Sequence, residues 1–242
     1  MRRLVGVGVG PGDPDLVTVK AVRVLREADL VLVPVMGDDV TGRAEATVRA
    51  HVDHDRVRRV TFALDDRGGV TARRTDAWDA AARAVADAYD SGAGTVAFAT
   101  IGDPNVYSTF SYLVQTVREL VPDLVVETVP GITAMQDLAA RSGTVLCEGT
   151  ESLALLPLTA GVDAFRAAVE HFDSVVAYKG GRHMPHVLEA LRETGRLDDA
   201  VYGASLGLPD EDIRPATDVV GEAPYLSTVI VPARRSGRGG RL

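Results

Sequence analysis

Cysteine and long apolar runs are scarce in this sequence. Cys147 is the single cysteine among 242 residues, which excludes an internal disulfide and is typical of proteins in a reducing cytoplasm. Apolar residues make up 46% of the chain, yet no run approaches the roughly 18 residues of a membrane-spanning helix. We therefore expect a cytoplasmic protein with no membrane partner.

Basic residues are outnumbered by acidic ones. The chain has 26 Lys and Arg against 34 Asp and Glu, and its formal net charge is −8. The last nine residues, RRSGRGGRL, contain four arginines, so the remainder is more acidic still. Because nucleic-acid binding relies on a basic surface, this balance argues against a nucleic-acid partner. We expect residues 233–242 to form a flexible Arg/Gly tail.

A complete nucleotide-binding motif is also lacking, although glycines are concentrated in GVGVGPGDPDLVT. A dinucleotide fingerprint needs glycines at its first, third and sixth positions. Counting from Gly6 puts Pro11 at the sixth position, and counting from Gly8 puts Asp13 there. No Gly-Lys-Ser/Thr follows, so a Walker loop is excluded too. This many glycines still indicates a backbone that something else approaches closely.

The sequence offers one short cluster of metal-ligating residue types: His51, Asp53, His54 and Asp55. They lie at the end of a predicted helix, and no matching ligands are found elsewhere in the sequence. We predict that the protein itself binds no metal.

Strands and helices alternate along the first half of the chain. Apolar runs predict these strands: Leu4–Val9, Leu30–Val35, Arg58–Leu64, Thr95–Thr100 and Leu124–Thr128. Helical spacing after Leu16 and the composition of later segments predict helices there and at Arg43–His51, Thr71–Tyr89 and Tyr107–Val121. The alternation predicts right-handed crossovers and a mainly parallel sheet with flanking helices.

The second half repeats this alternation with a different final strand. We predict strands at Leu153–Leu156, Ser174–Tyr178, Ala200–Leu206 and Tyr225–Val231, with helices near Ala164–His171 and Pro185–Glu193. The closing YLSTVIVP alternates apolar and polar residues, which indicates a mixed or antiparallel sheet. The predicted fold class is α/β, with domains at 1–125 and 126–232 before the tail.

Three glycine-bearing loops follow predicted strands and precede predicted helices. They are residues 6–14, residues 100–110 (TIGDPNVYSTF) and residues 129–134 (VPGITA). Open α/β sheets bind ligands at the carboxyl ends of their strands, where such loops gather. If the loops converge, they line one site with backbone and few cations. Each loop alone is equally typical of an ordinary turn between strand and helix.

Three segments, in this order and at these separations, resemble the tetrapyrrole (corrin/porphyrin) methyltransferase family: GVGVGPGDPDLVTVKAVRVLREADLVLVPV, IGDPNVYSTFSYL and VPGITAMQDLAAR. KGGRHMP and PYLSTVIVP extend the resemblance over nearly the whole chain except the tail. The resemblance implies a two-domain α/β fold, S-adenosylmethionine as methyl donor and a homodimer. Within the family, VYSTFSYL looks most like the branch that methylates C-20 of precorrin-2, or of its cobalt form, in cobalamin biosynthesis.

By position, the resemblance also implies which residues form the site. Those matched to cofactor contacts are Val9, Gly102, Asp103, Val106, Tyr107, Ser108, Thr133, Ala134, Leu156 and Leu206. Leu155 is the alternative to Leu156. Those expected to face the tetrapyrrole are Gly10, Pro11, Gly12 and Asp13. Because the substrate is rich in carboxylates, we add Lys179 and Arg182, whose segment is equally typical of a solvated basic loop.

Methyl transfer from a sulfonium needs mostly positioning, with the carbon nucleophile about 3–3.5 Å from the methyl group and water excluded. A proton must leave the methylated carbon afterwards. Asp103 and Tyr107 are the candidate acceptors, while Asp before Pro equally favours a loop-building role for Asp103. Three alternatives stay open: methylation of another precorrin position, a diphthine synthase-like activity, and a nucleotide-binding module without turnover.

Overall fold

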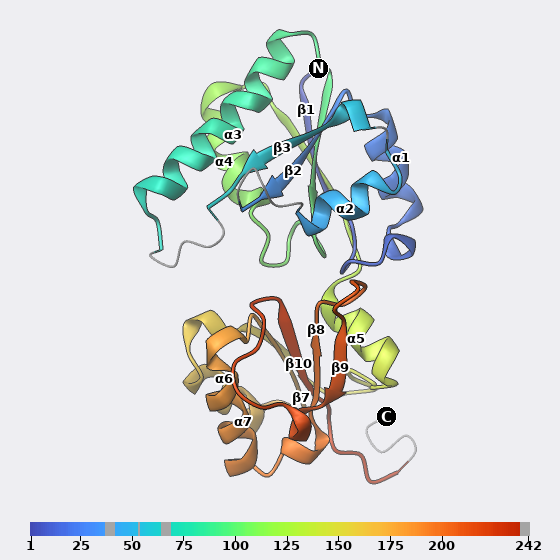
Figure 1. Ribbon diagram of the computed structural model, residues 1–242, viewed down its shortest axis with the longest axis vertical. Helices are drawn as coiled ribbons and strands as arrows, with labels where there is room; N and C mark the ends of the chain where they lie inside the picture. Colours follow the sequence, from blue (N-terminus) through green and yellow to red (C-terminus); the bar gives the residue numbers. More distant parts are fainter. Residues whose placement is uncertain (37–41, 53, 64–68, 238–242) are drawn as a thin grey trace. The chain divides into compact units, whose positions relative to one another are not determined.

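The chain forms two compact units, Met1–Thr133 and Ala134–Leu242, in a computed structural model that describes residues 1–36, 42–52, 54–63 and 69–237 (Figure 1). The border falls after strand β5 (Val125–Val129), which pairs with β1 (Arg3–Gly8) in the first unit. The predicted border at 125/126 lies inside β5, after its first residue, and would assign the rest of this strand to the other unit. No helix in the described part is long and apolar enough to cross a membrane.

The first unit is built on a parallel sheet with strand order β3-β2-β4-β1-β5. Its other strands are β2 (Leu30–Val35), β3 (Val57–Thr61) and β4 (Thr95–Thr100). One face is covered by α1 (Val19–Glu27) and α2 (Arg43–Arg49). The other is covered by α3 (Ala72–Asp90) and α4 (Phe110–Leu120) (Figure 1). The sheet is therefore buried on both faces, which explains its continuous apolar strands.

Helix starts in this unit follow local capping chemistry. The Thr18 hydroxyl accepts a hydrogen bond from the Ala21 N–H at 3.1 Å and begins α1. The Thr71 hydroxyl accepts one from the Arg74 N–H at 3.2 Å and begins α3. Such caps satisfy N–H groups that have no partner inside the helix. The predicted helix Thr71–Tyr89 is confirmed, with Thr71 as its cap.

The second unit contains a mixed sheet with strand order β6-β7-β10-β8-β9. The strands are β6 (Leu153–Pro157), β7 (Ser174–Tyr178), β8 (Val201–Ala204), β9 (Asp212–Pro215) and β10 (Ser227–Val231). β10 is antiparallel to both β7 and β8, and β6 is parallel to β7, so β6, β7 and β8 share one direction. α5 (Ala134–Ser142) covers one face, whereas α6 (Asp163–His171) and α7 (Met184–Glu193) cover the other.

Two arginines of the predicted tail, Arg234 and Arg235, form ion pairs with the second unit. The Arg234 guanidinium lies 2.6 Å from the Asp199 carboxylate, and that of Arg235 lies 2.5 Å from the Glu151 carboxylate. The second unit therefore extends beyond the predicted end at 232, because these arginines find acidic partners far away in sequence. The rest of the predicted tail, residues 238–242, lies outside the described residues.

Candidate functional site

The three glycine-bearing loops meet at one edge of the first sheet. β4, β1 and β5 are adjacent and parallel, so their carboxyl ends lie together. The Gly102 N–H donates to the Gly10 carbonyl at 2.7 Å, and the Gly131 N–H donates to the Asp103 carboxylate at 3.0 Å. The loops therefore converge within this unit.

The glycines allow the loops to approach one another through their backbones. A Cβ atom on Gly8 would lie 2.5 Å from the Gly102 carbonyl oxygen and 2.6 Å from the Gly131 nitrogen. A Cβ on Gly131 would lie closer still to the same Gly102 oxygen. Neither contact can be relieved by turning a side chain, because both partners are backbone atoms. The close neighbour suggested by the glycine-rich sequence is therefore the chain itself.

Asp103 holds two parts of this edge together. Its Oδ1 accepts a hydrogen bond from the Asn105 N–H at 2.8 Å, and its Oδ2 accepts the one from Gly131. The residue is 9% exposed. With both oxygens engaged by backbone donors, the carboxylate does the work of a loop-building residue. This geometry favours the loop-building interpretation over that of a proton acceptor.

Tyr107 combines an unusual backbone with a protonated side chain. Its φ is +50°, a left-handed conformation that costs a non-glycine residue free energy and is concentrated at functional sites. Tyr107 is 43% exposed, and the partial burial of its phenol raises the pKa above the usual value of 10.0. The phenol therefore stays neutral at physiological pH, which disfavours a role as general base. Val106, next to it, is partly exposed.

Ser108 fixes the start of α4. Its hydroxyl donates to the Thr100 hydroxyl at 3.1 Å and accepts from the Phe110 N–H at 3.1 Å. Ser108, which we predicted to contact the cofactor, therefore has a structural role at the start of α4. Val9, Gly102 and Thr133, three more of the predicted residues, are buried at the same edge.

The first glycine loop presents little surface. Gly10, Pro11 and Gly12 are all buried. The Thr47 hydroxyl of α2 donates to the Gly12 carbonyl at 3.3 Å, and the Asp13 carboxylate accepts from the Asp15 N–H at 2.9 Å. These contacts give the loop a role in building the edge, so the predicted direct contact of Gly10, Pro11 and Gly12 with a macrocycle finds no support in their burial.

A buried ion-pair cluster anchors α2, which holds this loop. The Glu45 side chain has no exposed surface and lies 2.7 Å from the Arg49 Nε and 2.8 Å from the Arg59 Nε. Burial alone would raise the pKa of Glu45, yet hydrogen bonds from Arg59 and Arg49 lower it below the usual value. Our sequence reasoning missed this cluster because its members come from a helix and a separate strand.

The second unit gathers predicted residues at the common carboxyl edge of β6, β7 and β8. The Met135 N–H at the start of α5 donates to the Tyr178 hydroxyl at 3.0 Å, so Ala134 lies beside the end of β7. Lys179 follows β7 with φ +63°, and Ser205 follows β8 with φ +51°. Together with Tyr107, these are the positive-φ residues other than glycine in the described chain. Lys179 and Ser205 directly follow a strand, whereas Tyr107 lies in the loop between β4 and α4.

The two candidate leucines, Leu155 and Leu156, lie on opposite faces of β6. Leu155 packs in a cluster that includes Ala134 and Leu206, the other two apolar residues predicted to contact the cofactor. Leu156 points to the opposite face, where it packs against the cluster under α6 and α7. Successive side chains of a strand alternate between faces, so only one of the two can join the predicted site. The structure favours Leu155 over Leu156.

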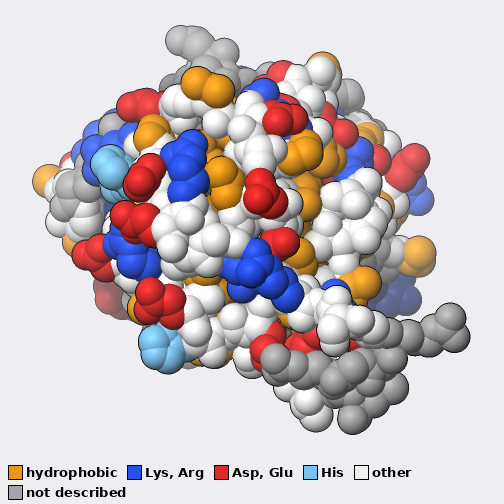
Figure 2. Space-filling view, turned by 90° about the horizontal axis from the view of Figure 1, so that it is seen from below, with side chains coloured by type: hydrophobic (Ala, Val, Ile, Leu, Met, Phe, Trp, Pro, Cys, Tyr) orange, Lys and Arg blue, Asp and Glu red, His pale blue; other side chains and the backbone are white. Residues whose placement is uncertain are grey.

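The two predicted cations lie at this edge in different surroundings. The Lys179 Nζ lies 5.8 Å from the centre of the Tyr225 ring. Arg182 is exposed in the short turn Gly181–His183, and among the described residues no carboxylate lies within ion-pair distance of it. Acidic and basic side chains are interspersed on the face of the molecule in Figure 2.

The short His/Asp cluster of residues 51–55, for which we predicted no metal binding, is described only in part. The His51 ring nitrogen Nε2 lies 2.9 Å from the Pro14 carbonyl oxygen, and Asp53 lies outside the described part. Throughout the described chain, no three His, Cys, Asp or Glu side chains are grouped so that they could hold a metal ion.

Comparison with known proteins gives consistent matches. A family model for Tetrapyrrole (Corrin/Porphyrin) Methylases matches residues 3–218. The chain is 36% identical over 237 residues to precorrin-2 C(20)-methyltransferase from Sinorhizobium sp, covering 95% of each protein. It is 29% identical over 233 residues to cobalt-precorrin-2 C(20)-methyltransferase from Salmonella typhimurium, again covering 95% of each.

A solved structure shares the fold. Uroporphyrin-III C-methyl transferase from Thermus thermophilus, complexed with S-adenyl homocysteine, matches with a TM-score of 0.61 and 23% identity. The match covers 94% of this chain and 96% of the other. At this identity the likeness concerns the fold, and it agrees with the predicted α/β architecture.

Proposed function

Because the chain belongs to the tetrapyrrole (corrin/porphyrin) methylase family, we propose that it transfers a methyl group from S-adenosylmethionine to C-20 of precorrin-2, or of cobalt-precorrin-2, in cobalamin biosynthesis. The products are precorrin-3A, or its cobalt counterpart, S-adenosylhomocysteine and the proton lost from the methylated carbon. The observation that carries this proposal is the similarity over almost the full length of the Sinorhizobium enzyme.

Each unit, taken separately, has residues that suit part of an S-adenosyl group. Ala134, Leu155 and Leu206 form an apolar cluster of the kind that packs against an adenine ring. On the first turn of α5, the Asp137 carboxylate pairs through Oδ1 with Arg141 at 2.8 Å, while its buried Oδ2 atom has no hydrogen-bond partner among the described residues. Such an acceptor needs a donor from a ligand or an ordered water. In the first unit, the sheet edge with Gly102, Asp103 and Thr133 offers mainly backbone groups.

In this proposal the protein contributes positioning. S-adenosylmethionine, when bound, supplies an electrophilic methyl group on a sulfonium and leaves as a neutral thioether. No residue therefore has to protonate the leaving group. Asp103 keeps two loops in register, and Tyr107 remains a neutral phenol that can donate a hydrogen bond. Both are assigned positioning roles, and the chain's main task is to orient the reacting carbons and exclude water.

We expect Tyr107→Phe to retain methyl transfer within about 10-fold of wild type, because a phenol with a raised pKa does not serve as the base. The pH profile of kcat should keep its shape. Steady-state kinetics across neutral and alkaline pH measures both. Loss of turnover by several orders of magnitude, with the cofactor still bound, would show that the phenol takes part in proton transfer.

Arg182 supplies a cation for the substrate carboxylates. We expect Arg182→Ala to raise the KM for precorrin-2 by about 10-fold, with kcat nearly unchanged, because a charge-assisted hydrogen bond is lost. A matched control is Arg192→Ala, whose guanidinium already pairs with Glu189 at 3.1 Å on α7. An unchanged KM for precorrin-2 in Arg182→Ala would exclude this role.

The proposed function is tested by binding and by product mass. Calorimetric titration with S-adenosylhomocysteine and, separately, NAD should give binding of the former alone. Metal-free and cobalt-loaded precorrin-2 are then incubated side by side with S-adenosylmethionine, and a mass gain of one methyl group identifies the accepted form. Binding without a mass gain on either tetrapyrrole would favour a non-catalytic module, and methylation of another substrate would favour a different branch of the family.

We also propose that the enzyme works in the cytoplasm as a homodimer, with neither nucleic acid nor membrane as a partner. Support comes from the single cysteine, the acidic net charge and the dimers common in the family. Sedimentation of the purified protein tests the dimer directly.

A further inference from the structure

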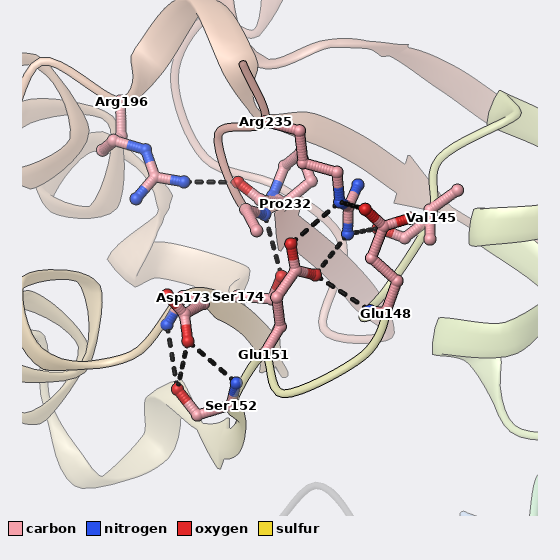
Figure 3. Close-up of polar contacts among 10 residues, drawn as sticks. Val145, Glu148, Glu151, Ser152, Asp173, Ser174, Arg196, Pro232 and Arg235 are labelled. Atoms are coloured by element: carbon pink, nitrogen blue, oxygen red, sulfur yellow. Dashed lines mark hydrogen bonds and ion pairs between the residues drawn. The ribbon is translucent and has the colours of Figure 1, made fainter. Parts of the chain in front are cut away.

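Arg235, near the end of the described chain, is bound to several points of one loop in the second unit (Figure 3). Its guanidinium donates to both oxygens of Glu151, at 2.9 and 2.5 Å, and to the Val145 carbonyl at 3.4 Å. The Glu148 carboxylate lies 3.3 Å from its Nε. The Glu151 side chain is only 1% exposed and that of Arg235 is 21% exposed, so this contact is shielded from solvent.

The local contacts stabilise the charged forms of both Arg235 and Glu151. The hydrogen bonds from Arg235 lower the pKa of Glu151, and those to Glu151 raise the pKa of Arg235. The Glu148 N–H also donates to the Glu151 carboxylate at 2.9 Å, which closes the loop on itself. A two-point contact between guanidinium and carboxylate fixes orientation as well as distance.

The segment that carries Arg235 is itself anchored to the sheet (Figure 3). The Ala233 N–H donates to the Ser174 hydroxyl at 2.8 Å, and the Arg196 guanidinium donates to the Pro232 carbonyl. On the other side of the loop, the Ser152 N–H and hydroxyl both donate to the Asp173 carboxylate at 2.9 Å. The loop is thus held between two fixed points, one of them Arg235.

This loop, residues 143–152, connects the two elements that carry the apolar part of the proposed cofactor site. It begins where α5 ends, and Ala134 lies at the other end of that helix. It ends where β6 begins, two residues before Leu155. Leu146, within the loop, packs in the same cluster as Ala134, Leu155 and Leu206. The contacts of Arg235 with Val145 and Glu148 lie on either side of Leu146.

We propose that Arg235 is a positioning residue for S-adenosylmethionine: by clamping loop 143–152 it holds Leu146 and Leu155 as one wall of the adenosyl site. The inference rests on the proposed function. It gives a task to an arginine that composition alone would assign to a flexible tail.

The experiment compares Arg235→Ala with Arg234→Ala in the full-length protein. Arg234 is the matched control, since it pairs with Asp199 and the Gly195 carbonyl and forms no hydrogen bond or ion pair with the loop among the described residues. We expect Arg235→Ala to weaken S-adenosylhomocysteine binding by about 10-fold, because loop 143–152 loses the contact that holds it in place. We expect Arg234→Ala to leave this binding unchanged. Arg235→Lys, which keeps the cation, should recover most of the affinity.

Three further readouts separate positioning from a loss of stability alone. In Arg235→Ala the KM for S-adenosylmethionine should rise while kcat at saturation holds, and amide hydrogen exchange should become faster in 143–152. Combining Arg235→Ala with Glu151→Gln should add little to the loss caused by either change, because both remove the same contact.

The failures can be told apart. A wild-type protein that does not bind S-adenosylhomocysteine overturns the proposed function and this inference with it. Normal binding by wild type together with an equal Kd in Arg235→Ala overturns only the inference, even if the melting temperature falls. An equal loss of affinity in Arg234→Ala and Arg235→Ala also contradicts it.

Discussion

Gly131→Ala is expected to destabilise the protein by about 3 kcal/mol or to prevent folding of the first unit, since overpacking against rigid backbone is costly. The added Cβ would lie inside contact distance of the Gly102 carbonyl oxygen and the Gly8 backbone. The loops after β1, β4 and β5 would have to separate, and the hydrogen bond between Gly131 and Asp103 would be lost with them. Chemical denaturation measures the change in the free energy of unfolding.

A control for this substitution lies in the same unit. At Gly94 the nearest atoms to an added Cβ are 3.8 and 3.9 Å away, an ordinary contact, and its φ lies outside the left-handed range. We expect Gly94→Ala to change the stability by less than about 0.5 kcal/mol. If Gly131→Ala is as stable as Gly94→Ala, the loops are not in direct backbone contact and the description of this edge is wrong.

Asp103→Ala is expected to weaken S-adenosylhomocysteine binding by about 100-fold, because the two loops that the carboxylate joins lose their register. Asp103→Asn keeps one acceptor oxygen, so its loss should be several-fold smaller. Calorimetry with the three proteins gives this order directly. If instead Asp103→Asn binds like wild type while kcat falls by several orders of magnitude, the carboxylate is the proton acceptor and the loop-building assignment fails.

Much of the fold follows from local sequence patterns. β2, β4 and β7 have the predicted bounds, since each is a continuous apolar run ended by polar or turn residues. β9 was not predicted, because Asp212–Pro215 contains two charged residues and a proline and becomes a strand only by pairing with β8. The domain border was placed too early for a related reason. β5 belongs to the first unit through its pairing with β1, a contact between distant segments.

The sequence was sufficient to predict which loops carry the candidate site, but it did not predict which residues contact one another there. The loops that meet belong to β1, β4 and β5, which are neighbours in space but not in sequence, and local patterns do not give that order. In LALLP every residue is apolar, so the pattern does not reveal which leucine faces α5. Arg235 and Glu151 are separated by 84 positions, and Arg235 belongs to an Arg/Gly-rich segment whose composition is typical of a flexible tail. For both reasons the sequence did not predict their ion pair.

The position of the transferred methyl group tests the central claim most directly. The protein is incubated with precorrin-2, metal-free and cobalt-loaded, and with S-adenosylmethionine carrying a ¹³C-methyl group. We predict one new ¹³C-methyl carbon in the product, bonded to C-20, together with S-adenosylhomocysteine. A label at another carbon, or an unlabelled tetrapyrrole in the presence of bound cofactor, would contradict the account.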